Sequence, residues 1–98
     1  DAPFIHVRSG RAIMGDTLRR KRGSTVDIRY ECVDSMGLQL IRVIENGKVV
    51  REHRPKDDTV VKGAYKAKVR SGRSYVRVEC FARDNRKAFA NPIYLHEA

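Results

Sequence analysis

The two cysteines are the residues whose chemistry depends most directly on their position in the sequence. Cys32 and Cys80 each share the parity of neighbouring apolar residues in segments that alternate apolar and polar side chains. In two facing sheets such positions point into the core. The pair is therefore a candidate inter-sheet disulfide, which would stabilise the fold by roughly 4 kcal/mol on the chain-entropy model. Buried cysteines are also common as small apolar core residues, and both alternatives stay open.

The residue types give little support to metal binding or catalysis. Zinc is disfavoured because the two cysteines lack Cys-x-x-Cys spacing and no histidine lies near them. His6, His53 and His96 are far apart in the sequence, and Asp57-Asp58 lacks the further oxygen ligands of a cation-binding loop. No serine, histidine and aspartate are placed to argue for a catalytic triad. We therefore expect no catalytic residue, no metal and no cofactor in this chain.

A run of basic residues could bind phosphate or another anionic group. The run consists of Arg19, Arg20, Lys21 and Arg22, with three arginines as reinforcement: Arg8, Arg11 and Arg73. The chain has 21 Lys and Arg against 12 Asp and Glu, a net charge of +9 that attracts any polyanion. Nucleic-acid modules mix such charge with exposed aromatics, whereas the aromatics here total 7% and fall mostly on core parity. A solvated loop is the favoured interpretation, and nucleic acid is not the favoured partner.

Two aromatic residues fall on the outward side of a predicted strand. Tyr75 and Phe81 share the parity of the polar residues in residues 74–82, opposite to that of Val76, Val78 and Cys80. They are candidates for a docking patch that contacts a neighbouring domain. Partial burial under loops is the alternative.

Alternating hydrophobicity and turn residues predict the elements that position these side chains. We expect strands at residues 4–7, 13–16, 25–33, 38–45, 48–54, 60–69, 74–82 and 87–95, with residues 19–23 as a loop. Asn46-Gly47 is a strong hairpin signal, and residues 38–45 are apolar on both faces, which is typical of a central strand. Pro92 has no amide donor, so the strand that contains it must be an edge or carry a bulge there.

These elements predict an all-β fold. The expected architecture is an immunoglobulin-like two-sheet antiparallel β-sandwich of about seven to eight strands, with an incomplete barrel as the alternative. A chain of 98 residues is long enough for one domain, residues 1–98, with one modest core. There is no tryptophan, and Val78 rather than a tyrosine stands two residues before Cys80, so the antibody hallmarks are missing. No apolar run approaches the length of a membrane helix, and we expect no membrane partner.

The end of the chain resembles a known family. Residues 74–95 contain Tyr-Val-Arg-Val-Glu, an Asp-led turn and Asn-Pro-Ile-Tyr-Leu. This pattern resembles the C-terminal end of metal-dependent hydrolases of the polymerase-and-histidinol-phosphatase (PHP) superfamily, in whose carbaryl-hydrolase-like branch a β-sandwich follows the catalytic barrel. The likeness continues, less specifically, at residues 14–18 and 45–50, although Met14 stands where that branch often has proline. None of the superfamily's metal ligands falls on a residue of this chain.

The resemblance implies a non-catalytic accessory or docking domain of a PHP-like hydrolase, at the C-terminal part of a larger protein. Its partner would be the catalytic domain of the same polypeptide or another copy of the chain. The alternative, which rests on the positive charge, is a stand-alone module that binds an anionic partner such as nucleic acid or another polyanion. The compartment stays open, cytoplasmic or exported, and we expect a bacterial or archaeal source.

Overall fold

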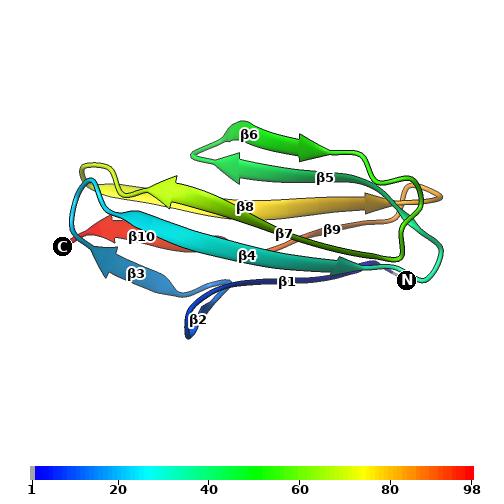
Figure 1. The fold of residues 1–98 in the computed structure, drawn as a ribbon, viewed down its shortest axis with the longest axis horizontal. Coiled ribbons are helices and arrows are strands. Elements are labelled where there is room, and N and C mark those ends of the chain that lie inside the picture. Colours follow the sequence, from blue (N-terminus) through cyan, green and yellow to red (C-terminus); the bar gives the residue numbers. More distant parts are fainter. Residues whose placement is uncertain (1) are drawn as a thin grey trace.

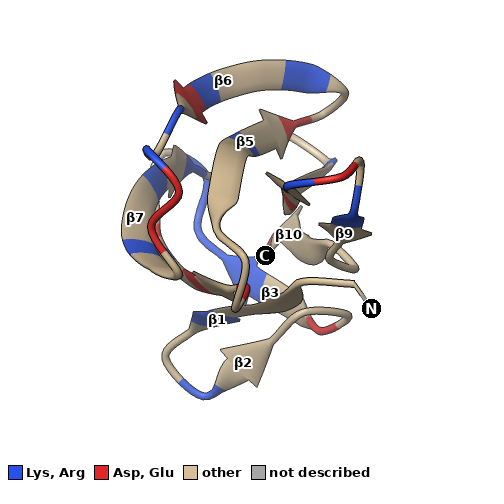
Figure 2. Ribbon diagram, turned by 90° about the vertical axis from the view of Figure 1, so that its right-hand side faces the viewer, with Lys and Arg blue, Asp and Glu red and all other residues tan. Residues whose placement is uncertain are grey.

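The computed structural model describes residues 2–98, which fold into two β-sheets packed against each other (Figure 1). Within that range the chain forms ten strands and no helix. It follows that no helix in the described part of the chain is long and apolar enough to cross a membrane. Figure 2 views the molecule from one end and shows basic segments on both β6 (Lys48–His53) and β7 (Val60–Lys68). The predicted all-β sandwich is confirmed.

The two sheets differ in size. The smaller sheet has the strand order β2 (Ala12–Ile13), β1 (Phe4–Ser9), β4 (Thr25–Val33) and β7. The larger sheet has the order β3 (Thr17–Arg20), β10 (Ile93–Glu97), β8 (Arg73–Ala82), β5 (Leu38–Glu45) and β6, and β9 (Lys87–Phe89) also pairs with β8. Three strands of the larger sheet therefore have neighbours on both sides: β10, β8 and β5.

The core lies between β4 and β8, the two strands with the most regular alternation. Their inward side chains are all buried: Val26, Ile28, Tyr30, Cys32, Val76, Val78, Cys80 and Ala82. Burying one large aliphatic side chain contributes about 1.5–3 kcal/mol. The apolar side chains of both strands therefore fix which face of each sheet points inward.

The basic run is only partly a loop, contrary to expectation. Arg19 and Arg20 lie in β3, and the turn before β4 begins after them. β3 runs parallel to β10, whereas the other strand pairs of residues 2–98 are antiparallel. Along β3 only Leu18 packs against the core. The arginine side chains stay in solvent at the sheet edge, so their mutual repulsion does not prevent the backbone from pairing.

The predicted strand at residues 87–95 is broken at Pro92, as its missing amide donor requires. β9 ends at Phe89 and β10 begins at Ile93, while the Pro92 carbonyl accepts a hydrogen bond from the Gly15 amide at 2.7 Å. This break and the unexpected β3 account for ten strands where seven to eight were expected.

The hairpin of β5 and β6 agrees with its sequence signal. Asn46 and Gly47 have φ angles of 50° and 80°, the positive values that a type I′ turn needs at both positions. β5 pairs with β8 on one side and β6 on the other, so its predicted central position is confirmed.

Two arginine–carboxylate pairs tie the loops at the end of the sandwich opposite the C-terminus. Arg86 donates to both carboxylate oxygens of Asp34 at 2.5 and 2.7 Å, and Asp34 is buried. Arg83 binds Asp57 in the same way at 3.2 and 3.0 Å, but this pair is half-exposed. The hydrogen bonds from Arg86 hold the pKa of Asp34 below its usual range.

We expect Asp34→Asn to lower the thermal unfolding midpoint at pH 7 by several degrees, and Asp57→Asn to change it much less because solvent screens that pair. The folded-state pKa of Asp34 is depressed. Its contribution is therefore present above the unfolded-state pKa of about 4 and is lost as pH falls through the folded-state value. Thermal unfolding followed from neutral to strongly acidic pH measures this. If the unfolding midpoint of Asp34→Asn stays below that of the unaltered chain by the same amount down to strongly acidic pH, this stabilising role of the Asp34 carboxylate is contradicted.

Candidate functional site

The outer face of the larger sheet carries the two aromatic residues that the alternation placed outward. Tyr75 and Phe81 both lie on this face of β8, and both are partly buried. They are six residues apart on the strand, which is about 20 Å. They therefore belong to two separate surfaces and do not form one patch. Their role in docking stays a prediction.

Phe81 belongs to a group that we call the phenylalanine patch: Phe81, Phe89, Leu40, Arg42 and Lys87. The rings of Phe81 and Phe89 lie edge to face, with centroids 5.9 Å apart and an interplanar angle of 64°. The Arg42 guanidinium lies 5.4 Å from the Phe81 centroid, and the Lys87 amine 5.8 Å from that of Phe89. Phe89 is 54% exposed. The sequence pattern did not single out Phe89, because the strand that contains it is broken before Ile93 and the alternation is interrupted there.

Ion pairs separate this patch from Tyr75. On the same face Arg77 binds Glu79 at 2.5 Å, and Arg42 binds Glu52 on β6 at 3.1 Å. Arg54 binds Glu52 from the other side at 3.4 Å. Partly exposed pairs of this kind add little to stability, but they place a polar band between the two aromatic surfaces.

Tyr75 lies beside an aromatic residue of the neighbouring strand. Backbone register places Tyr75 of β8 opposite Tyr94 of β10. A hollow of about 390 Å³ at this point, which we call the tyrosine hollow, is lined by Thr17, Arg73, Ser74, Tyr75, Tyr94 and His96. Tyr94 is 39% exposed, and its ring centroid lies 6.4 Å from that of His96. Exposed aromatic surface here adjoins basic side chains.

The basic run lies at the end of the sandwich where the chain ends (Figure 1). The connection between β7 and β8 reaches the same end, because the Gly23 amide donates to the Val69 carbonyl and the Val69 amide to the Ser24 carbonyl, both at 2.8 Å. The structure thereby gathers cations from distant segments. We call this group the basic end: Arg19, Arg20, Lys21, Arg22, Lys68, Arg70 and Arg73, all exposed. Anion binding by residues 19–22 stays a prediction.

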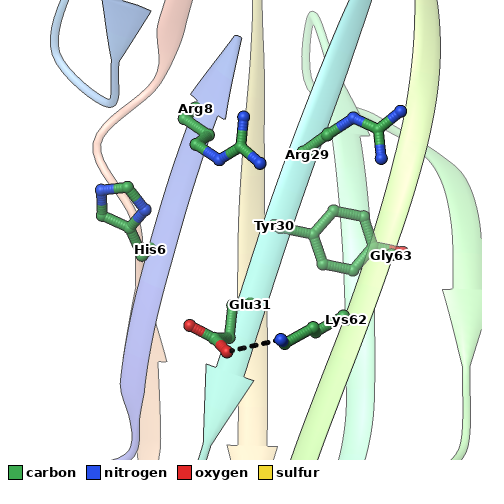
Figure 3. Close-up of a pocket in the computed structure, with 7 residues that line it drawn as sticks. All are labelled: His6, Arg8, Arg29, Tyr30, Glu31, Lys62 and Gly63. Atoms are coloured by element: carbon green, nitrogen blue, oxygen red, sulfur yellow. Dashed lines mark ion pairs between the residues drawn. The ribbon is translucent and has the colours of Figure 1, made fainter. Parts of the chain in front are cut away.

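Of the three reinforcing arginines, only Arg73 lies at the basic end. Arg11 lies in the turn between β1 and β2. Arg8 lies on β1 opposite Arg29 and lines a cavity of about 190 Å³ on the outer face of the smaller sheet (Figure 3). Gly63 lies opposite Tyr30 on β7 and leaves room for its ring, since a Cβ at Gly63 would lie 2.3 Å from that ring.

The charges around this cavity are largely paired. Arg29 binds Asp27 at 2.9 Å, and Lys62 binds Glu31 at 3.6 Å, as the dashed line in Figure 3 marks. The cavity therefore offers a weaker net attraction to an anion than the basic end does.

Cys32 and Cys80 meet in the core between the sheets, as their parity predicted. Both are fully buried free thiols, one on β4 and the other on β8. Their mutual hydrogen bond, together with burial, raises the pKa of the Cys32 thiol. The disulfide between them stays a prediction.

The remaining candidate ligands are dispersed over the sandwich. His6, His53 and His96 lie on β1, β6 and β10. Residues 2–98 contain no group of three or more His, Cys, Asp or Glu side chains that could hold a metal ion.

Comparisons with known proteins identify the fold. No protein-family model matches the chain, and no curated protein matches it by sequence. The structure is similar to a fibronectin(III)-like module of CbhA from Clostridium thermocellum, with a TM-score of 0.63 and 16% identity over 94% of this chain and 98% of that one. It is also similar to a lytic polysaccharide monooxygenase of Jonesia denitrificans, with a TM-score of 0.55 and 13% identity over 85% of this chain and 57% of that one. The chain therefore has a fibronectin III-like β-sandwich fold.

We expect both thiols of the reduced protein to resist a thiol reagent in the folded state and to react once denaturant exposes them, because neither is accessible to solvent. Oxidation that joins Cys32 to Cys80 should raise the free energy of unfolding by roughly 4 kcal/mol. Thiol titration and denaturant unfolding measure both effects. Cys80→Ala is the control, in which the same oxidant should leave the free energy of unfolding unchanged. Rapid labelling of the folded protein would contradict the buried thiol pair.

Proposed function

We propose that this chain is a non-catalytic accessory module that docks onto the catalytic domain of the polypeptide to which it belongs. The observation that carries this proposal is the phenylalanine patch, where Phe89 exposes half of its surface and lies edge to face with Phe81. Grouped apolar side chains exposed on a sheet face are a common mark of a protein interface.

The surroundings of the two rings fit an interface of this kind. Arg42 and Lys87 lie over the rings, and the ion pairs of Glu79 and Glu52 border them on one side. Protein interfaces commonly have aromatic anchors at their centre and a polar rim around them. The phenylalanine patch has both parts of this arrangement.

The finer proposal is that the catalytic domain is a PHP-like metal-dependent hydrolase. Support comes from the sequence resemblance of residues 74–95, which supply β8, β9 and β10. Phe81 and Phe89 stand on these same strands, so the segment that resembles the superfamily also carries the proposed docking surface.

We expect Phe89→Ala to weaken docking at least about tenfold, because a buried aromatic anchor commonly contributes 2 kcal/mol or more to an interface. The measurement is calorimetric titration of this chain with the separately produced remainder of its polypeptide. Val49→Ala, an exposed apolar residue on β6, is the control and should bind like the unaltered chain.

Three results would count against this proposal or its finer part. Equal binding by Phe89→Ala would reject the patch as the docking surface. Self-association of the chain that Phe89→Ala abolishes would make a second copy the partner. A remainder without a metal-binding barrel would reject the PHP-like parent.

The second candidate function is binding of an anionic partner by the basic end. The observation that favours it is that folding brings seven separate cations of residues 19–22 and 68–73 to one end of the molecule. Such clustering raises the local attraction to a polyanion above what net charge alone provides.

For this function we expect heparin to bind at low salt, with an affinity that falls steeply as salt rises. Replacing residues 19–22 with alanine should reduce the slope of log K against log salt by about 3, since each of the four basic contacts contributes roughly 0.7 to 0.9. Arg8→Ala with Arg11→Ala is the control, because both residues lie away from the basic end. An equal loss per removed charge in the two variants, which remove four and two charges, would mean that net charge, rather than the basic end, governs binding.

A further inference from the structure

Three neighbouring strands present six outward side chains in two rows. Register places Thr17, Tyr94 and Tyr75 side by side on β3, β10 and β8. It places Arg19, His96 and Arg73 in the adjoining row of the same strands. Strands lie about 4.8 Å apart, and successive side chains on one face lie about 7 Å apart. The six residues therefore form a compact surface, which we call the tyrosine–arginine array.

The aromatic members of the array have accessible ring surface. Tyr94 is 39% exposed, and Tyr75 and Tyr94 both line the tyrosine hollow. The Tyr75 hydroxyl lies 3.8 Å from the position that a Cβ on Gly47 would take, so its ring extends toward the turn between β5 and β6. Tyr94 is therefore the more accessible stacking surface, and Tyr75 borders the hollow from the side of that turn.

The charge around the array is strongly positive. Among residues 2–98 no ion pair engages Arg19 or Arg73. The other five cations of the basic end lie at the same end of the sandwich: Arg20, Lys21, Arg22, Lys68 and Arg70, of which Arg70 lies 4.0 Å from the Glu45 carboxylate. The nearby carboxylates are already engaged, because Glu97 accepts the Gly72 amide at 3.1 Å and Glu45 is buried against the Tyr65 hydroxyl at 2.8 Å.

We propose that the tyrosine–arginine array binds single-stranded nucleic acid. Unpaired bases stack on Tyr75 and Tyr94, and the phosphates that join them lie against Arg19, Arg73 and the rest of the basic end. Exposed aromatics combined with a basic track are the two features that sheet surfaces use to bind single strands. Nucleic acid was disfavoured from the sequence because the aromatics total 7% and fall mostly on core parity. Tyr75 and Tyr94 nevertheless lie on the outward face, and folding brings them beside Arg19 and Arg73.

The two features together select the ligand class. A sulfated polysaccharide satisfies the cations but has no base to stack. A duplex satisfies the cations, but its bases are stacked on each other and have no free face. A strand with unpaired bases uses both the tyrosines, through stacking, and the arginines, through its phosphates. This inference rests on the second candidate function and names its partner, whereas docking through the phenylalanine patch is independent of it.

The test is fluorescence anisotropy of the full chain with labelled oligo-dT and oligo-U of about ten nucleotides, and with a duplex of equal length. Tyr94→Leu and Tyr75→Leu should each weaken single-strand binding by about fivefold to a hundredfold with little change in salt slope. Arg73→Ala should reduce that slope by about 0.7. Phe89→Leu, an exposed aromatic on the phenylalanine patch, is the matched control and should bind like the unaltered chain.

The outcomes separate this inference from the function on which it rests. Tighter binding of oligo-U would identify RNA as the preferred single strand, and tighter binding of oligo-dT would identify DNA. Duplex and heparin binding as tight as single-strand binding, unaffected by the tyrosine variants, would overturn the inference and leave the anionic function standing. Absence of binding to every polyanion would reject both. Tyr75 is partly buried, so Tyr75→Leu could fail to fold. The inference is then tested by Tyr94→Leu, which replaces an exposed residue, and by NMR shifts of the Tyr94 and His96 rings when oligo-dT is added.

Discussion

The alternation of side chains along β8 is the constraint on which the rest of the structure depends. Val76, Val78 and Cys80 are fully buried between the sheets, so the opposite face of the strand must carry Arg77 and Glu79. A shift of one residue would place those charges in the core and expose the valines. Because β8 lies centrally in the larger sheet, its register also fixes that of β5 and β10 on either side.

This register divides the outer face of the larger sheet into regions of different chemistry. Phe81 lies toward one end of β8 and Tyr75 toward the other, with the Arg77–Glu79 pair between them. The neighbouring strands extend each region, since Phe89 joins Phe81 and Tyr94 joins Tyr75. A single sandwich can in this way offer an apolar surface for a protein partner and a separate aromatic and basic surface for an anionic one. The functions proposed for the two surfaces are therefore compatible.

The loops at the two ends are fixed by different interactions. At one end the buried pair of Asp34 and Arg86 ties together loops that follow β4 and β8. At the other end, backbone hydrogen bonds between Gly23, Ser24 and Val69 hold the basic segments together, although their charges repel one another. The basic end is thus held in place by the backbone, which leaves its side chains exposed to solvent.

The sequence by itself determined the features that depend only on residues close together along the chain. Alternation identified the inward side of β4 and β8, including Cys32 and Cys80, while Asn46-Gly47 and Pro92 marked a turn and a break through their own backbone chemistry. Only the tertiary structure decided that β3 pairs in parallel with β10 and so brings residues 17–20 beside residues 94–97. Hydrogen bonds between segments more than 70 residues apart leave no local pattern in either one. For that physical reason the sequence could name Arg19 and Tyr75 as separate candidates, but could not show that they lie on one surface.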